Sequence, residues 1–219
     1  MISLRMNDKI FIKNPESTDL GKSIIRGSVE LIEDLGYENF TFKKLAKHIG
    51  STEASIYRYF SSKHKILIYL CSWYWSWMEY KITFAINNIK SVEMRLEISL
   101  KLLTEVPEQD TMFQHIDEQK LFSIVIEESS KAFLSKQVDE NNVEGYFLPY
   151  KSLVDMVSNI ILEINQDYEY PHMLVSSVIE GAHLQRFFAE HLPRLTDETE
   201  DKEAITCFFT NIAKNAIKK

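Results

Sequence analysis

The chain has 219 residues, of which 45% are hydrophobic and 26% charged, so it is long enough for a buried core and too apolar for a disordered protein. Its two cysteines, Cys71 and Cys207, form no CxxC pair, so we expect neither a disulfide framework nor a cysteine-based zinc site. Residues 1–12 lack a sustained apolar stretch, and the longest uncharged apolar-rich run, 66–78, is shorter than the roughly 20 residues of a membrane span. We therefore expect a cytoplasmic protein with no membrane partner.

The net charge of −7 is unevenly distributed along the chain. Residues 1–68 carry 11 Lys and Arg against 8 Asp and Glu, whereas residues 69–219 carry 14 against 24. The segment 41–65 holds six basic residues and a single acid, Glu53. A basic stretch on an acidic chain is typical of a nucleic-acid contact, although a solvated helix face would give the same pattern.

The first third of the chain predicts three helices. Residues 1–18 show no clear period and are expected to be a mobile arm. A helix with apolar residues at helical spacing follows and stops at Gly36. Thr41 caps a second helix that Gly50 ends, and Ser51 or Thr52 caps a short third helix.

The remainder also has helical periodicity and no strand pattern. A polar stretch, 139–145, is expected to be a loop. The expected helices span residues 63–89, 91–106, 118–137, 149–164, 171–192 and from about 199 to the end.

Two short helices joined by a glycine turn predict a helix-turn-helix over residues 41–60. Its second helix must bury one face, here Ile56 and Phe60, against the first helix. The other face must be small and polar to enter the major groove of DNA. Thr52, Glu53, Ser55 and Arg58 meet that requirement.

This region resembles the TetR family of bacterial regulators over about 45 residues. In that family the first helix ends in Gly-Tyr, the second opens with Thr, the third ends in Tyr-x-Tyr/His-Phe and the fourth opens with Lys. The matching positions here are Ile24-Ile25, Leu31-Ile32, Leu35-Gly36-Tyr37, Phe40-Thr41, Leu45-Ala46, Ile49-Gly50, Ile56-Tyr57-Arg58-Tyr59-Phe60, Ser62-Lys63 and Leu67.

The resemblance implies a role for each matching residue. Thr41, Tyr57 and Lys63 would contact backbone phosphate, with help from Lys43 and Lys44. Thr52, Glu53, Ser55 and Arg58 would lie along the recognition surface. Because Glu53 repels phosphate, it would either accept from a cytosine N4 or face solvent. The resemblance also implies a variable helical C-terminal domain that holds an effector pocket and a dimer interface.

Two departures from the family pattern affect the DNA contact. Ser51-Thr52 stands where Val-Ser is frequent, and Ala54 replaces a frequent glycine in the third helix. Thr52 still serves as a cap. The methyl group of Ala54 leaves less room for close backbone approach, so the docking angle or the sequence preference is expected to differ.

The helix that starts at residue 63 is crowded with aromatic side chains. Some of them must face the core, and the rest must face a cavity, a partner protein or solvent. We consider two alternatives, an ordinary core and an aromatic-lined pocket for an apolar or flat effector. The candidate pocket residues are Trp73, Trp77, Tyr80 and Phe84.

The last two helices offer a candidate dimer interface. A DNA palindrome requires two recognition helices about 34–36 Å apart, which a chain with one helix-turn-helix supplies only by pairing. The apolar residues available for an intermolecular four-helix bundle are Leu184, Phe187, Phe188, Ile205, Phe208, Phe209 and Ile212. The alternative is that this stripe packs on its own domain.

Enzymatic patterns are weak. Glu169-x-x-His172 and Glu180-x-x-His183 resemble the Glu-x-x-His pairs of di-iron proteins, but they fall on one predicted helix, whereas that site draws its pairs from different helices. No cofactor and no metal ligand is therefore expected, and no catalytic residue is assigned.

The sequence predicts an all-α protein with an N-terminal three-helix helix-turn-helix domain and a larger helical domain for effector binding and dimerisation. The expected boundaries are 1–18 for the arm, 19–65 for the DNA-binding domain and 66–219 for the second domain. The function expected is a transcriptional repressor that binds a double-stranded DNA operator as a homodimer and is released by a small molecule. The alternatives are an effector-independent nucleoid-binding protein and a helical enzyme or carrier that has lost DNA binding.

Overall fold

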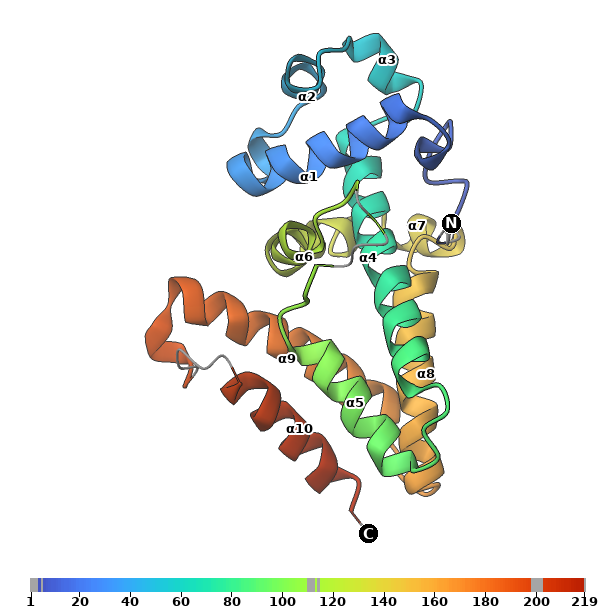
Figure 1. The fold of residues 1–219 in the computed structure, drawn as a ribbon, viewed down its shortest axis with the longest axis vertical. Helices are drawn as coiled ribbons and strands as arrows, with labels where there is room; N and C mark the ends of the chain where they lie inside the picture. Colours follow the sequence, from blue (N-terminus) through green and yellow to red (C-terminus); the bar gives the residue numbers. More distant parts are fainter. Residues whose placement is uncertain (1–3, 5, 110–112, 114, 198–202, 219) are drawn as a thin grey trace. The chain divides into compact units, whose positions relative to one another are not determined.

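The computed structural model describes residues 4, 6–109, 113, 115–197 and 203–218, and these contain helices and no strand. This confirms the all-α prediction. The elements, labelled in Figure 1, are η1 (Pro15–Ser17), α1 (Asp19–Asn39), α2 (Phe42–His48), α3 (Glu53–Tyr57), α4 (Lys63–Ile86), α5 (Val92–Thr104), α6 (Glu118–Phe133), α7 (Val138–Val143), α8 (Leu148–Ile164), α9 (Pro171–His191), η2 (Pro193–Leu195) and α10 (Ala204–Ala216).

The chain forms two compact units, and each unit is built from two separate segments of the sequence. Unit 1 combines Met1–Ser76 with Pro107–Pro149, and unit 2 combines Trp77–Val106 with Tyr150–Lys219. The segments 1–18, 19–65 and 66–219 stay a prediction of domain organisation, because a grouping of contacts does not test where a domain folds independently.

Unit 1 contains the predicted helix-turn-helix. Helices α2 and α3 lie on one side of α1, and α6 packs on the other side (Figure 1). Gly27 allows α1 and α2 to approach closely, since a Cβ atom there would lie 2.6 Å from Cγ2 of Ile49. Phe40, Leu45 and Ile56 are buried in the resulting core.

Unit 2 is held by apolar packing and by buried hydrogen bonds between helices. A Cβ atom on Gly181 of α9 would lie 2.6 Å from the Phe209 ring, so this glycine lets α10 pack close to α9. The Arg186 guanidinium donates to the Thr104 carbonyl over 3.0 Å, which joins α9 to the end of α5. Asn165 donates from Nδ2 to the Ile217 carbonyl at the end of α10, also over 3.0 Å.

Three sequence predictions need correction. The stretch 139–145 contains most of the short helix α7 rather than a loop, with the Asn141 N–H donating to the Gln137 carbonyl and the Glu144 N–H to the Glu140 carbonyl. Helix α4 ends at Ile86 instead of 89, and Asn88 has a positive φ that a helix cannot continue. Helix α6 ends at Phe133 instead of 137. The predicted start of the last helix near residue 199 lies outside the described residues.

The two cysteines occupy opposite environments. Cys71 on α4 is buried, and burial together with the charge of Glu128 raises the pKa of its thiol to about 12. Cys207 on α10 is exposed. Among the helices that the structure describes, none is long and apolar enough to cross a membrane.

The buried His183 side chain makes the stability of the chain depend on pH. Burial, with the charge of Arg186, lowers its pKa from 6.5 to about 4, so the folded chain resists protonation that the unfolded chain accepts. The contribution is complete above pH 6.5 and falls as pH drops from 6.5 to 4, by roughly 3 kcal/mol. Urea unfolding at stepped pH should show this slope flattened in His183→Gln and kept in the exposed control His191→Gln. Equal slopes in the two variants would contradict the assignment.

Candidate nucleic-acid interface

The short helix α3 presents the polar surface that the sequence predicts for DNA recognition. Thr52 is its N-cap, since the Thr52 hydroxyl accepts from the Ser55 backbone N–H over 3.2 Å. Ile56 is buried beneath the helix, while Glu53 and Arg58 are exposed. Helix α3 therefore has one face fixed in the core and one face of small and polar side chains toward solvent.

Helix α2 is N-capped by Thr41 as predicted, and the Thr41 hydroxyl accepts from the Lys44 N–H over 3.2 Å. Lys43 and Lys44 are exposed, but the Lys44 ammonium donates to the Asn39 carbonyl over 2.8 Å. Tyr57 is 51% exposed and packs edge-on against Phe42, with ring centroids 4.8 Å apart. Two of the predicted phosphate contacts, Thr41 and Tyr57, are thus at the surface.

Lys63, the third predicted phosphate contact, is engaged inside unit 1. Its ammonium donates to the carbonyls of Tyr37 and Glu38, over 3.0 and 3.1 Å, at the end of α1. It also lies 4.5 Å from the centroid of the Tyr37 ring. Burial, with the charges of Glu38 and Glu128, raises the pKa of Tyr37 to about 12, so the ring stays a neutral phenol. The phosphate contact of Lys63 stays a prediction, and it would compete with these bonds.

Glu128 of α6 holds the same turn from the other side. Gly36 has φ 74° and ψ 154°, which interrupts α1 and leaves the Tyr37 N–H without a helical acceptor. The Glu128 carboxylate, 8% exposed, accepts from this N–H over 2.9 Å. Its other oxygen pairs with Lys131. The segment that leads from α1 into α2 is therefore fixed by charged side chains of α4 and α6.

The aromatic residues predicted to line an effector pocket lie in different surroundings. Trp73 and Trp77 are buried, and Trp73 makes an edge-on contact with Phe113 at 5.2 Å between centroids. Phe84 is 73% exposed and stacks on Tyr80 with a centroid distance of 6.3 Å. The four residues thus divide between core and surface, and their role as a ligand site stays a prediction.

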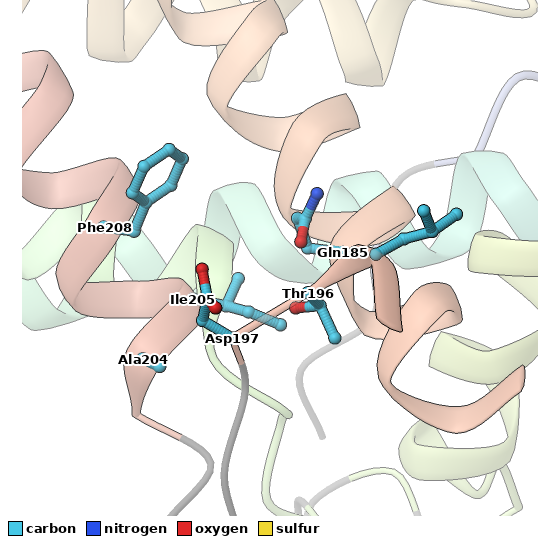
Figure 2. A pocket seen from close by; sticks show the side chains of 7 residues that line it. Gln185, Thr196, Asp197, Ala204, Ile205 and Phe208 are labelled. Carbon is cyan, nitrogen blue, oxygen red and sulfur yellow. The ribbon is translucent and has the colours of Figure 1, made fainter. Parts of the chain in front are cut away.

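A pocket of about 190 Å³ lies in unit 2 between α9, the segment after η2 and α10. Figure 2 shows Ile205 and Phe208 of α10 on one side and Gln185 and Thr196 on the other, and Asp197 also lines the pocket. This volume is below the roughly 300 Å³ at which pockets for drug-sized ligands begin, so it suits at most a small group. Among the described residues that line it, none belongs to α4.

The predicted dimer residues divide in the same way. Ile205 is buried in unit 2 and Phe209 packs against Gly181, so these two serve their own domain. Leu184, Phe208 and Ile212 are exposed, whereas Phe187 and Phe188 are half-buried. The interface itself stays a prediction, with a smaller apolar face than the sequence indicates.

The residues of the two Glu-x-x-His patterns have other contacts. Glu180 accepts from the Tyr150 hydroxyl over 2.7 Å, and His172 pairs with Asp155 over 2.9 Å. Within the described part of the chain, no group of three or more His, Cys, Asp or Glu residues could hold a metal ion.

Sequence reasoning missed two features of this interface. Glu128 lies in the apolar stripe of α6, at helical spacing between Val125 and Ala132. A charged residue in an apolar stripe indicates a buried charge with a specific partner, and the sequence shows this pattern. The segment before α1 also carries a signal, the apolar run Ile10-Phe11-Ile12, which the prediction of a mobile arm ignored. Ile10 is buried, and the Ile12 N–H donates to the Tyr59 carbonyl over 2.7 Å.

A family model described as bacterial regulatory proteins, tetR family, matches residues 24–70. The match covers α1 from Ile24 onward, α2, α3 and the first residues of α4, which are the elements that build the surface described above. No curated protein matches the sequence.

Several solved structures have the same fold. AibR, solved in complex with isovaleryl coenzyme A and operator DNA, is 15% identical with a TM-score of 0.61, over 87% of this chain and 96% of that one. FadR from Bacillus subtilis, in complex with stearoyl-CoA, is 14% identical with a TM-score of 0.60, over 90% and 97%. The TetR family transcriptional regulator PfmR from Thermus thermophilus is 13% identical with a TM-score of 0.59, over 90% and 99%. At these identities the likeness shows the fold.

Proposed function

We propose that this chain is a repressor that binds an operator as a homodimer and releases it when a small molecule binds; the match of residues 24–70 to the model of bacterial regulatory proteins of the tetR family supports the proposal. The observation that carries the proposal is the polar, solvent-facing surface of α3, capped at Thr52 and anchored by Ile56. It acts in the cytoplasm, where the DNA lies, and no catalytic activity is assigned to it.

DNA recognition divides between two sets of residues. Thr41, Lys43 and Tyr57 contact phosphates, which position the protein without reading sequence. Ser55 and Arg58 of the α3 surface face the bases, where an arginine pairs best with guanine in the major groove. The acidic charge of the chain as a whole requires that these local basic groups supply the attraction to DNA.

The DNA proposal predicts that the affinity for DNA depends steeply on salt and that different residues control affinity and sequence preference. We expect selection from genomic fragments to recover a palindromic site, with affinity falling steeply as salt rises. Arg58→Ala should change the preference among sequences, whereas Lys43→Ala should weaken all sequences about equally. Fluorescence anisotropy measures both effects. Failure of the unaltered protein to enrich any site at low salt would overturn the proposal.

Homodimer formation is proposed through the exposed faces of α9 and α10. Leu184, Phe208 and Ile212 leave an apolar surface after the core of unit 2 has been built. Two such surfaces related by a two-fold axis would form an intermolecular four-helix bundle. Such a pairing also supplies the second recognition helix that a palindrome requires.

The dimer proposal is tested by placing charges on α10. The double variant Phe208→Glu with Ile212→Glu should stay folded, sediment as a monomer and lose operator binding, because buried carboxylates would repel across the axis. Met94→Glu, a change at another exposed apolar residue on α5, serves as the matched control and should stay dimeric. A monomeric unaltered protein at micromolar concentration would refute the interface.

An acyl-coenzyme A is the effector class that the fold relatives favour. AibR and FadR were solved with isovaleryl coenzyme A and stearoyl-CoA respectively. In this chain the stacked Tyr80 and Phe84 on α4, one turn along from the buried Trp77, offer apolar surface suited to an acyl chain. Met156 adds an adaptable side chain to the same unit, with its sulfur 3.5 Å from the Thr83 hydroxyl of α4.

Thermal unfolding with defined acyl-CoA probes tests the effector. At one hundred times its dissociation constant, an effector should stabilise the fold by about 2.7 kcal/mol and should release DNA. Isovaleryl-CoA and stearoyl-CoA are the probes, free CoA is the control, and Phe84→Ala should weaken the effect. If neither probe shifts the midpoint or the DNA affinity, acyl-CoA is excluded and effector-independent DNA occupancy becomes the favoured function.

A further inference from the structure

The segment before α1 is firmly docked on the DNA-binding unit. Ile10 is 1% exposed, and the Phe11 ring packs edge-on against Tyr69 of α4, 6.2 Å between centroids. Glu16 accepts from the Tyr69 hydroxyl over 2.9 Å. A Cβ on Gly21 would lie 2.2 Å from the Pro15 carbonyl oxygen, so η1 lies directly against the start of α1.

This segment meets the helix-turn-helix at the end of the recognition helix. The Ile12 N–H donates to the Tyr59 carbonyl over 2.7 Å, and the hydroxyls of Thr18 and Tyr59 share a hydrogen bond of 2.7 Å. Tyr59 directly follows Arg58, the C-cap of α3. Residues 12–18, which lie outside the family match, therefore pack against the residue that follows the C-cap of α3.

Lys13 is the cation that this arrangement places beside α3. It is exposed, and its ammonium lies 5.2 Å from the centroid of the Tyr59 ring, within the range of a cation–π contact. In the described part of the chain, no ion pair involves Lys13. Its charge is thus held near α3, and no carboxylate of the described residues neutralises it.

Four other lysines of unit 1 are already engaged, whereas Lys43 and Lys47 of α2 are exposed like Lys13. Lys9 pairs with Glu144 over 2.8 Å, and Lys120 pairs with Glu33 over 3.1 Å. Lys63 and Lys44 donate to backbone carbonyls at the end of α1. The contrast matters because each of these cations must leave a carboxylate or a carbonyl to reach DNA, whereas Lys13 gives up only its contact with an aromatic ring.

We propose that Lys13 binds a DNA phosphate and that residues 12–18 form a second, sequence-independent contact beside the recognition helix. A helix in the major groove has a phosphate row on either side, so a cation docked next to the end of α3 lies within reach of one row. The proposal rests on the proposed DNA-binding function and adds a contact that the helix-turn-helix itself does not supply.

The test compares Lys13→Ala, Lys13→Arg and the matched control Lys9→Ala in the full chain, on a short mixed-sequence duplex over a salt series. Lys13→Ala should weaken binding several-fold at low salt and lower the salt slope by about 0.9, the value for one phosphate contact. Lys13→Arg should restore both. Lys9→Ala should change neither the affinity nor the salt slope, because Lys9 lies on the same segment as Lys13 but its charge is paired with Glu144.

Three outcomes decide the proposal. If Lys13→Ala and Lys9→Ala have the same DNA affinity and the same salt slope, the Lys13 contact is overturned. The proposed DNA-binding function is then unaffected, because the unaltered protein still binds. If Lys13→Ala changes the preference among duplexes but leaves the salt slope unchanged, the phosphate contact is also overturned, because Lys13 then contacts a base. Absence of salt-dependent binding by the unaltered protein removes the proposed function and this contact together.

Discussion

The hydrogen bond from the Tyr37 N–H to the Glu128 carboxylate is the constraint on which the DNA-binding surface depends. A positive φ at Gly36 turns the chain out of α1 and would leave a buried amide unsatisfied, at a cost of about 1–3 kcal/mol. A carboxylate satisfies it but needs a cation, which Lys131 supplies. Phe40 then enters the core and Thr41 caps α2, so the direction of the later elements of the motif follows from this turn.

The helix-turn-helix was readable from the sequence because its signals are local. Thr41 and Thr52 act as N-caps as predicted, and Gly50 takes a positive φ of 65° at the turn between the two helices. Capping and turn formation depend on residues within three or four positions, so they survive without knowledge of tertiary contacts. For the same reason Pro171 correctly predicted the start of α9.

The contacts made by long side chains were not readable, because they depend on residues far apart in sequence. Lys63 fits a family pattern for phosphate binding, yet its ammonium is bound to carbonyls about 25 positions earlier. Periodicity placed Ile205 and Phe208 on one stripe, but only tertiary packing decides that Ile205 is buried and Phe208 exposed. The helix within the polar stretch 139–145 was missed for a related reason, since composition alone does not show that the chain packs there with Asn141 buried.

The contrast between the two cysteines gives the native chain a single reactive thiol. Thiolate is the reactive form, and burial keeps Cys71 protonated and shielded from reagents. Cys207 is open to solvent on α10, next in sequence to Phe208. A maleimide fluorophore or spin label would therefore attach at one known position of the unmodified protein and report directly on the surroundings of α10.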